Sequence, residues 1–338
     1  MAEEARFWEK ADDGSVRCRL CPHACLIAEG HRGICGVREN REGVLYSLVY
    51  GRPCTLTVDP IEKKPLFHFL PGTGSLSLAT AGCNFRCRFC QNHSISQVKN
   101  GVQFDGEIHA PGEITAAASE RNIQSISCTY TEPTVFFEYA YDIGIKAREQ
   151  GIRNVFVSNG FMSGHTRDAC LDFLDAINCD LKCFSSETYR NVIGGELQPV
   201  LDTIAFFREN GIWVEVTTLL VTDMNDSDSE IEQIAEFLVS VDPAIPWHVS
   251  RFHPTYKMNE RLPTPVERIE KAVEIGKEAG LRFVYAGNVH GSSHEHTVCP
   301  GCGSILIRRI GFSCSIEHMQ NGTCLSCGEN IEGVWCGS

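Results

Sequence analysis

One cysteine-rich loop decides how the rest of this chain is interpreted. It reads Ala81-Gly82-Cys83-Asn84-Phe85-Arg86-Cys87-Arg88-Phe89-Cys90-Gln91-Asn92 and follows the apolar run 76–81. Its three cysteines, Cys83, Cys87 and Cys90, are spaced C-x3-C-x2-C. Three thiolates on one short loop can hold three irons of a [4Fe–4S] cluster, because cysteine sulfur is the usual ligand of such clusters. The fourth iron then stays open for a substrate or cofactor, as an open position separates catalytic from structural zinc sites.

Two other interpretations of this loop fit less well. Buried cysteines are common as inert, small hydrophobic residues, but three at this spacing directly after a strand-like run form a specific pattern. A zinc knuckle needs four ligands in paired C-x2-C spacing, which the loop alone does not supply. The pattern therefore favours an iron–sulfur site.

The composition of the chain agrees with metal binding in a reducing compartment. Its 338 residues allow one large domain with one or two small attachments. Its 18 cysteines and its acidic start (Met1-Ala2-Glu3-Glu4-Ala5-Arg6), unlike a signal peptide, favour the cytoplasm and metal ligation over disulfides. No apolar run is long enough to span a bilayer. A net charge of −13 argues against nucleic acid as a partner.

Strand-like and helix-like patterns alternate through the central region, 71–290. The helical pattern occurs at 134–150 and 264–279, and Gly151, Gly211 and Gly280 stand where helices would end. Nearly continuous apolar runs, as expected for strands buried on both faces of a parallel sheet, occur at 76–81, 125–130, 154–158, 176–181, 213–220, 247–252 and 282–286. An open doubly wound sheet is one possible architecture, and a partial (β/α)6-type barrel of six or seven units is the favoured one.

The first 70 residues predict a small cysteine-rich region. Cys18, Cys21, Cys25 and Cys35 are spaced C-x2-C-x3-C-x9-C, with Pro22, Gly33 and Gly36 supplying turns that bring the thiolates together. Three alternatives stay open for them: zinc, a second iron–sulfur cluster, or no metal. Short strands are expected at 45–49 and 55–58.

The last region, 291–338, carries two C-x2-C-G knuckles. They consist of Cys299 and Cys302, then Cys324 and Cys327. Four thiolates in this spacing predict a tetrahedral Zn²⁺ site in a zinc ribbon. A strand of the ribbon is expected at 305–312.

Polar residues follow several of the predicted central strands at their carboxyl ends. The rule that ligands bind at that end of parallel strands nominates Glu132, Asn159, Asp180, Lys182, His253 and Asn288 as lining a pocket. Taken singly, each has a solvated loop as the alternative, and Glu132 or Lys182 alone would favour that alternative. Their shared position in successive units favours the pocket.

The loop at Cys83 closely resembles that of the radical S-adenosylmethionine (SAM) superfamily, whose pattern is CxxxCxxC with an aromatic residue, here Phe89, before the last cysteine. The resemblance implies a [4Fe–4S] cluster whose open iron is chelated by the amine and carboxylate of SAM. It also implies reductive cleavage of SAM to methionine and a 5′-deoxyadenosyl radical, which takes a hydrogen atom from a substrate. Such chemistry is expected in an anaerobic setting.

Within that superfamily the chain looks most like the glycyl-radical-enzyme activases, such as those of pyruvate formate-lyase. In them a Gly-Gly-Glu-type turn contacts the methionyl amine of SAM, and Glu132-Pro133 matches its acidic part, although Tyr130-Thr131 replaces the glycines. The resemblance also places Asn159, Asp180 and Lys182 beside the cofactor and substrate. Over nearly its full length the chain resembles the AmmeMemoRadiSam-system radical enzymes.

Three functions remain after this comparison of motifs. The first is an activase that forms a glycyl radical on a partner protein, and the second is a radical enzyme that modifies a small molecule or peptide. The third is a non-catalytic iron–sulfur or zinc protein that senses redox state. For the enzymes, the resemblance implies a reductant such as flavodoxin or ferredoxin.

Overall fold

The protein is built around one open, eight-stranded sheet. The computed structural model describes residues 3–98, 101–289 and 291–335. The sheet has the order β14-β13-β12-β11-β10-β9-β8-β7, so neighbours in space are neighbours in the chain. Strands β8 to β14 are parallel, whereas β7 pairs antiparallel with β8. The strands are β7 (Thr55–Pro60), β8 (Gly74–Ala79), β9 (Ser125–Cys128), β10 (Arg153–Ser158), β11 (Ala176–Asp180), β12 (Trp213–Leu220), β13 (Trp247–Arg251) and β14 (Val284–Gly287).

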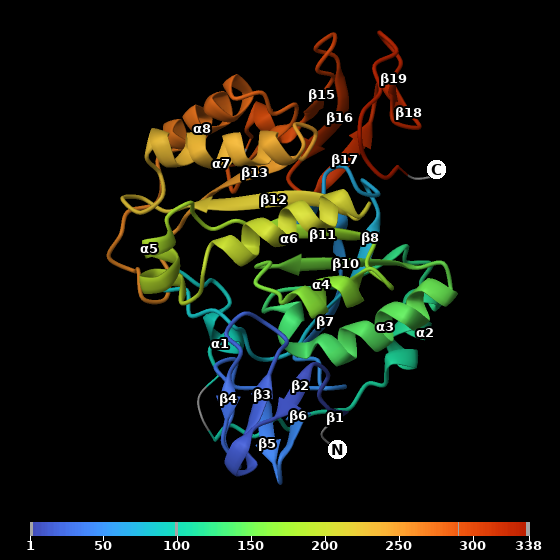
Figure 1. The fold of residues 1–338 in the computed structure, drawn as a ribbon. Helices are drawn as coiled ribbons and strands as arrows, with labels where there is room; N and C mark the ends of the chain where they lie inside the picture. Colours follow the sequence, from blue (N-terminus) through green and yellow to red (C-terminus); the bar gives the residue numbers. More distant parts are fainter. Residues whose placement is uncertain (1–2, 99–100, 290, 336–338) are drawn as a thin grey trace.

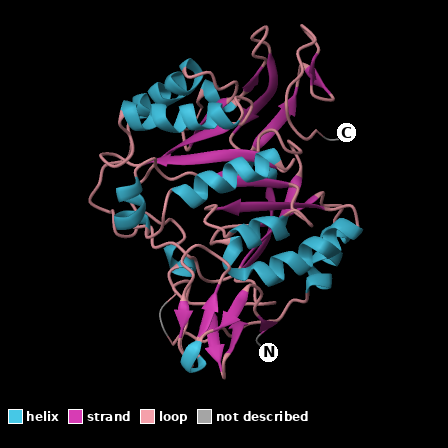
Figure 2. Cartoon of the chain, in the orientation of Figure 1, coloured by secondary structure: helices cyan, strands magenta, loops and turns pink. Residues whose placement is uncertain are grey.

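The predicted alternation of strands and helices is confirmed. Each of the seven apolar runs overlaps one parallel strand, and helices lie against the sheet between them (Figures 1 and 2). Within the described chain the end strands β14 and β7 do not pair with each other, so the sheet forms a partial barrel. The main helices are α2 (Pro111–Glu120), α3 (Phe137–Glu149), α4 (Gly164–Cys170), α6 (Gln198–Glu209), α7 (Asp228–Val241) and α8 (Val266–Glu278), with short turns at α1 (His93–Ser96) and α5 (Ser186–Thr188).

The helix ends follow the local sequence. Residues 134–150 form a 3₁₀ turn, Pro133–Phe136, that leads into α3. Gly151, Gly211 and Gly280, which follow α3, α6 and α8, have φ angles of 73°, 81° and 111°, a conformation that glycine adopts without steric cost. Among the described helices, none is both long and apolar enough to cross a membrane.

The N-terminal module lies at one end of the barrel, drawn in blue in Figure 1. It consists of the sheets β2-β3-β4 and β1-β6-β5. Their strands are β1 (Glu3–Glu4), β2 (Trp8–Lys10), β3 (Val16–Cys18), β4 (Leu26–Ile27), β5 (Arg38–Arg41) and β6 (Val44–Ser47). The strand β7, which also precedes residue 71, joins the central sheet instead.

A buried ion pair fastens this module to α3. Arg38 on β5 and Glu138 on α3 have 1% and 3% exposure, and both guanidinium Nη atoms donate to the carboxylate, at 3.0 and 2.8 Å. The Arg6 amide also donates to Glu138, at 2.6 Å. One carboxylate therefore holds strand β5 and the segment between β1 and β2 against the barrel.

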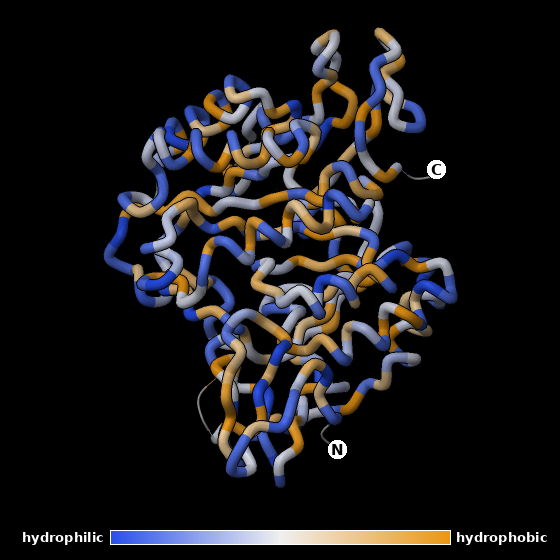
Figure 3. Tube along the Cα trace, viewed as in Figure 1, coloured by the Kyte–Doolittle hydropathy of each residue, from blue (hydrophilic) through white to orange (hydrophobic). Residues whose placement is uncertain are grey.

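The C-terminal module lies at the opposite end of the barrel and has its own small core. Its strands are β15 (Thr297–Val298), β16 (Ile305–Ile310), β17 (Ser313–Ile316), β18 (Met319–Gln320) and β19 (Thr323–Cys324). Leu306, Ile307 and Trp335 pack there against Tyr285 of β14. The main core, in contrast, runs continuously from the N-terminal module through the barrel, where hydrophobic residues concentrate along the central strands (Figure 3).

Candidate functional site

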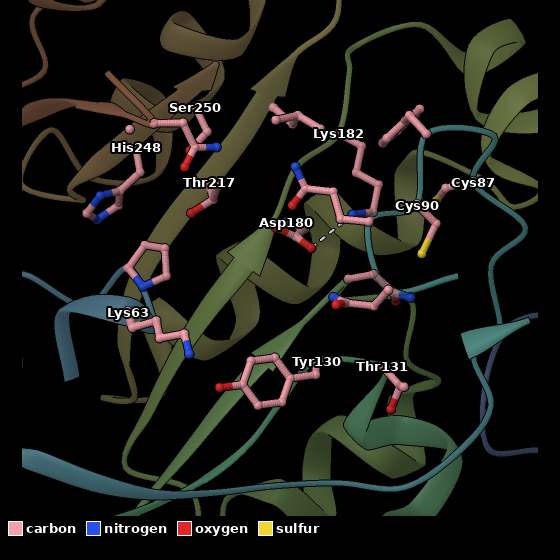
Figure 4. A pocket seen from close by; sticks show the side chains of 18 of the residues that line it. Lys63, Cys87, Cys90, Tyr130, Thr131, Asp180, Lys182, Thr217, His248 and Ser250 are labelled. Carbon is pink, nitrogen blue, oxygen red and sulfur yellow. Dashed lines mark hydrogen bonds and ion pairs between the residues drawn. The ribbon is translucent and has the colours of Figure 1, made fainter. Parts of the chain in front are cut away.

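A pocket of about 550 Å³ lies at the carboxyl ends and inner face of the parallel strands. Its walls combine the cysteine loop after β8 with polar side chains from β9 to β14, several of which are shown in Figure 4. The hairpin between β16 and β17 also reaches this pocket, through Gly311 and Phe312. The C-terminal module therefore forms part of the pocket wall.

All three cysteines of the loop line the pocket. Cys83 and Cys87 are buried and Cys90 is partly exposed. No other cysteine is found among the described residues that line this pocket. Three sulfur ligands beside open space fit a [4Fe–4S] cluster with one iron free for a further ligand.

The loop is tightly packed where it enters the pocket. Gly82 has a φ of 99°, and a Cβ atom there would lie 2.6 Å from Val37 Cγ1 and 2.9 Å from the Cys35 carbonyl oxygen. Only glycine fits this approach of the loop to the N-terminal module. The Asn159 amide group donates to Asn84 Oδ1 at 2.8 Å, which holds the loop from the barrel side.

Most of the polar residues expected at the pocket are found there. Phe89, Asn159, Asp180, Lys182 and Asn288 line it. Lys182 Nζ lies 2.9 Å from Asp180 Oδ2, as the dashed line in Figure 4 shows. Burial alone lowers the pKa of Lys182, but the Asp180 carboxylate outweighs it and raises that pKa above its usual value. The pair thus brings an ammonium group to the pocket wall.

His253 and Glu132 occupy other positions. His253 is exposed and does not line the pocket. Glu132 is fully buried behind the wall. Its Oε1 accepts hydrogen bonds from the Thr134 amide at 3.0 Å, the Thr134 hydroxyl at 2.6 Å and the Ser158 hydroxyl at 2.7 Å. Its Oε2 accepts one from the Asn159 amide at 2.8 Å.

These hydrogen bonds give Glu132 a role within the protein, and its expected contact with the amine of SAM stays a prediction. They join the end of β9 to the end of β10 and fix Asn159, which in turn holds Asn84 beside Cys83. The turn 130–131 carries side chains in place of glycines, and Tyr130 and Thr131 line the pocket themselves. We therefore propose that Glu132 is a positioning residue for the cysteine loop.

We expect Glu132→Gln to destabilise the fold by about 1–3 kcal/mol, because an amide cannot accept the hydrogen bonds of both carboxylate oxygens and leaves a buried donor unpaired. Glu120→Gln, on the exposed end of α2, serves as the control. The free energy of unfolding and the affinity for SAM are measured on both variants. A lower affinity for SAM at an unchanged free energy of unfolding would contradict the positioning role and would support a direct contact between Glu132 and SAM.

Sequence analysis missed a charged cluster that contacts Tyr130, a residue of the pocket lining. Tyr130 lies beside Asp59 and Lys64, with Lys64 Nζ 2.7 Å from Asp59 Oδ2 and 2.9 Å from the Tyr130 hydroxyl oxygen. Burial lowers the pKa of Lys64 to about 8. Asp59 and Lys64 precede the first parallel strand, so the rule of strand ends did not point to them. The available signal in the sequence was Tyr130, which stands where the activases have a glycine.

A second missed group comes from the strand interiors. His248 on β13 lines the pocket, and its Nε2 lies 2.7 Å from Oε2 of the fully buried Glu215 on β12. Glu215 also accepts hydrogen bonds from the Phe67 and His68 amides. Every second residue of a strand faces the same side. The available signal was therefore the pair of polar residues two positions apart on each strand, Glu215 with Thr217 and His248 with Ser250.

The four C-terminal cysteines form a compact group. All of their sulfur atoms lie within 4.8 Å of one another, and the Sγ pairs Cys299–Cys327 and Cys302–Cys324 are 3.6 and 3.7 Å apart. None of the four lines the pocket. The predicted four-cysteine site is thus present, and its closed geometry is that of a structural site.

The four N-terminal cysteines also converge. Cys18, Cys21, Cys25 and Cys35 line a separate cavity of about 20 Å³. All four are free thiols.

Comparison with known proteins places this architecture. Residues 77–238 match the family described as the Radical SAM superfamily. An uncharacterized protein of Methanocaldococcus jannaschii is 46% identical over 334 residues, which cover 98% of this chain and 99% of that protein. A second protein of that organism, named provisionally as a glycyl-radical enzyme activating enzyme, is 27% identical over 214 residues, which cover 59% of this chain and 76% of that protein.

Solved structures show the same fold at low sequence identity. A radical SAM methyltransferase from Sphaerobacter thermophilus has a TM-score of 0.51 at 13% identity, covering 84% of this chain and 76% of that chain. Streptococcus suis SuiB bound to S-adenosylmethionine has a TM-score of 0.52 at 14% identity, covering 71% and 56%. From the family match, the near full-length relative and the shared fold, we conclude that the chain belongs to the radical SAM superfamily.

Proposed function

We propose that this protein is a radical SAM enzyme in which Cys83, Cys87 and Cys90 hold the [4Fe–4S] cluster. The observation that carries the proposal is the set of three thiols, with no fourth cysteine among the described lining residues, facing one pocket of about 550 Å³. When bound, the cluster supplies one electron that cleaves SAM to methionine and a 5′-deoxyadenosyl radical, which takes a hydrogen atom from the substrate. A reductant such as flavodoxin or ferredoxin would supply that electron.

The residues of the chain bind, orient and shield the reactants. Asn159 fixes the cysteine loop, and Phe89 contributes an apolar surface beside it. Lys182 is held by Asp180 at the pocket wall, where its ammonium can pair with an anionic group such as a carboxylate. We propose that Asn159, Asp180 and Lys182 contact SAM or the substrate.

The pocket mouth supports a peptide or a protein segment as the substrate. Phe312 lines the pocket, and both it and its neighbour Ile310 are more than half exposed, at 56% and 76%. Exposed apolar residues beside a functional pocket are typical of interaction sites. The surface supports an activase-like reaction on a partner protein, to which the provisional name of the 27%-identical relative also points.

Modification of a peptide or small molecule is the second candidate. It is favoured by the large share of polar side chains on the inner wall, including Thr217, His248 and Ser250, which offer hydrogen bonds to a polar ligand. The order of three cysteine groups along the chain supports membership of the AmmeMemoRadiSam-system enzymes. Since the described cysteines form no disulfide, we place the protein in the cytoplasm.

The test is anaerobic reconstitution with iron and sulfide, followed by an assay for 5′-deoxyadenosine with dithionite as reductant. Formation of 5′-deoxyadenosine that depends on reductant supports the radical SAM proposal. Reconstituted protein that carries a cluster and still does not cleave SAM would favour the non-catalytic, redox-sensing alternative. Deuterium transfer from labelled peptide or small-molecule candidates into 5′-deoxyadenosine then separates the two substrate classes.

For the C-terminal module, 291–338, we propose Zn²⁺ at Cys299, Cys302, Cys324 and Cys327. The Sγ distances of 3.6 and 3.7 Å agree with about 3.8 Å for thiolates around one tetrahedral zinc with bonds of about 2.3 Å. We propose that the chain is divided into three regions: the cysteine-rich region, 1–70, the barrel, 71–290, and this C-terminal module.

We expect Cys302→Ser to release about one zinc per chain and to unfold the module, because binding of a structural metal contributes directly to folding. Iron at the Cys83 loop should be retained. Metal analysis and limited proteolysis measure both effects, with Ser315→Ala on the exposed face of β17 as the control. Loss of iron with zinc retained would show that the two sites are assigned the wrong way round.

A further inference from the structure

The N-terminal cysteines form a ligand set that the proposed reaction does not use. Cys18 lies at the end of β3, Cys21 and Cys25 lie in the turn that leads to β4, and Cys35 precedes β5. The Cys18 amide donates to the Cys25 carbonyl oxygen at 3.0 Å, which closes the turn. The four thiols line one cavity together with apolar side chains such as Leu20 and Ile27. Free thiols that converge in this way have the arrangement of a metal site.

The distances between the sulfur atoms distinguish a site for a single metal ion from a site for a cluster. The C-terminal cysteines, whose sulfur atoms all lie within 4.8 Å of one another, are the only group that compact among the described residues. The N-terminal set is wider, and so is the set at Cys83, Cys87 and Cys90. Four thiolates on one zinc must come within about 3.8 Å of one another, whereas on a cubane cluster each binds a different iron and stands farther from the others.

The N-terminal cysteine set lies directly behind the loop that carries Cys83. Cys83 lines the large pocket, and the next residue, Asn84, lines the N-terminal cavity. His23 Nε2 lies 2.8 Å from the Asn84 carbonyl oxygen. On the same side, the Cys35 carbonyl oxygen packs against Gly82. The loop segment 82–84 thus contacts the N-terminal cavity and also carries Cys83.

We propose that Cys18, Cys21, Cys25 and Cys35 hold a second [4Fe–4S] cluster, back to back with the cluster at Cys83. Four protein ligands leave it no open iron, so it carries electrons and does not bind substrate. The inference rests on the proposed function only in that the neighbouring loop holds the first cluster.

The experiment counts iron and zinc after anaerobic reconstitution of the full chain and two variants. Two [4Fe–4S] clusters give about eight iron atoms per chain. We expect about four in the loop variant Cys83→Ser/Cys87→Ser/Cys90→Ser and about four in Cys18→Ser/Cys25→Ser, each with one zinc. After reduction with dithionite, each variant should show the simple electron paramagnetic resonance signal of one reduced cluster. The full chain should show a signal broadened by coupling between two neighbouring clusters.

The outcomes that overturn the inference differ from those that overturn the proposed function. A loop variant that holds two zinc atoms and no iron identifies the N-terminal set as a zinc site, and one zinc with no iron shows that this set binds no metal. A loop variant with as much iron as the full chain contradicts the proposed function instead. Uncoupled signals in the full chain contradict the back-to-back arrangement. Should Cys18→Ser/Cys25→Ser fail to fold, the loop variant decides the identity of the site alone.

Discussion

Cys87→Ala is expected to abolish the reductive cleavage of SAM. Removal of one of three thiolates leaves the cluster two protein ligands. No further cysteine is found among the described residues that line the pocket, and the amide of Asn159 cannot replace the lost sulfur. The yield of 5′-deoxyadenosine after anaerobic reconstitution should fall to the level of a protein-free reaction. Iron should fall by about four atoms per chain.

Cys54→Ser provides the matched control. Cys54 is exposed, and its thiol donates to the Ala79 carbonyl oxygen at the end of β8, outside the pocket lining. A serine can make the same hydrogen bond, so cleavage should persist. An active Cys87→Ala protein would refute the assignment of this loop as the cluster site.

The second large effect is expected at the contact between the N-terminal module and α3. Glu138→Ala should destabilise the fold by about 3–5 kcal/mol, because it leaves the buried guanidinium of Arg38 without its partner. The Arg6 amide loses its acceptor as well. Denaturant unfolding of the zinc-loaded protein, before iron is added, measures the change.

Two further variants test the cause. Glu149→Ala, on the exposed end of the same helix, should change the free energy of unfolding by no more than about 0.5 kcal/mol. Arg38→Met/Glu138→Leu removes both charges and should recover much of the loss, since replacing a whole buried ion pair by apolar residues is often nearly neutral. A double variant as unstable as Glu138→Ala would show that geometry and not the unpaired charge is the cause.

The parts of the fold that sequence could predict are those with a local signal. Strands buried on both faces are mostly apolar, so the run 213–220 predicted the bounds of β12 to the residue, although Glu215 interrupts it. The cysteines of each group are close in the chain, and their spacing alone indicated where ligands converge. The wider contacts had no such signal: Asp59 and Tyr130 are 71 positions apart and meet only because β7 joins the sheet.

Glu132 shows the limit of reasoning from strand ends. The rule placed it correctly at the carboxyl end of β9, but which way its side chain points depends on the turn that follows. There Glu132 caps the 3₁₀ turn at Pro133–Phe136, accepting from the Thr134 amide, and it does not line the pocket. A side chain that satisfies buried amides and one that binds a ligand look the same in sequence.

With the proposed zinc in the C-terminal module, the hairpin that carries Phe312 would make substrate binding depend on the supply of that metal. Its two residues in the pocket wall belong to a module whose core includes Cys299 and Cys324, whereas the cysteine loop belongs to the barrel. A molecule that has lost its C-terminal metal would still cleave SAM but would bind the substrate more weakly. It would consume SAM in futile turnover, so that metal starvation would appear as uncoupling and not as inactivity.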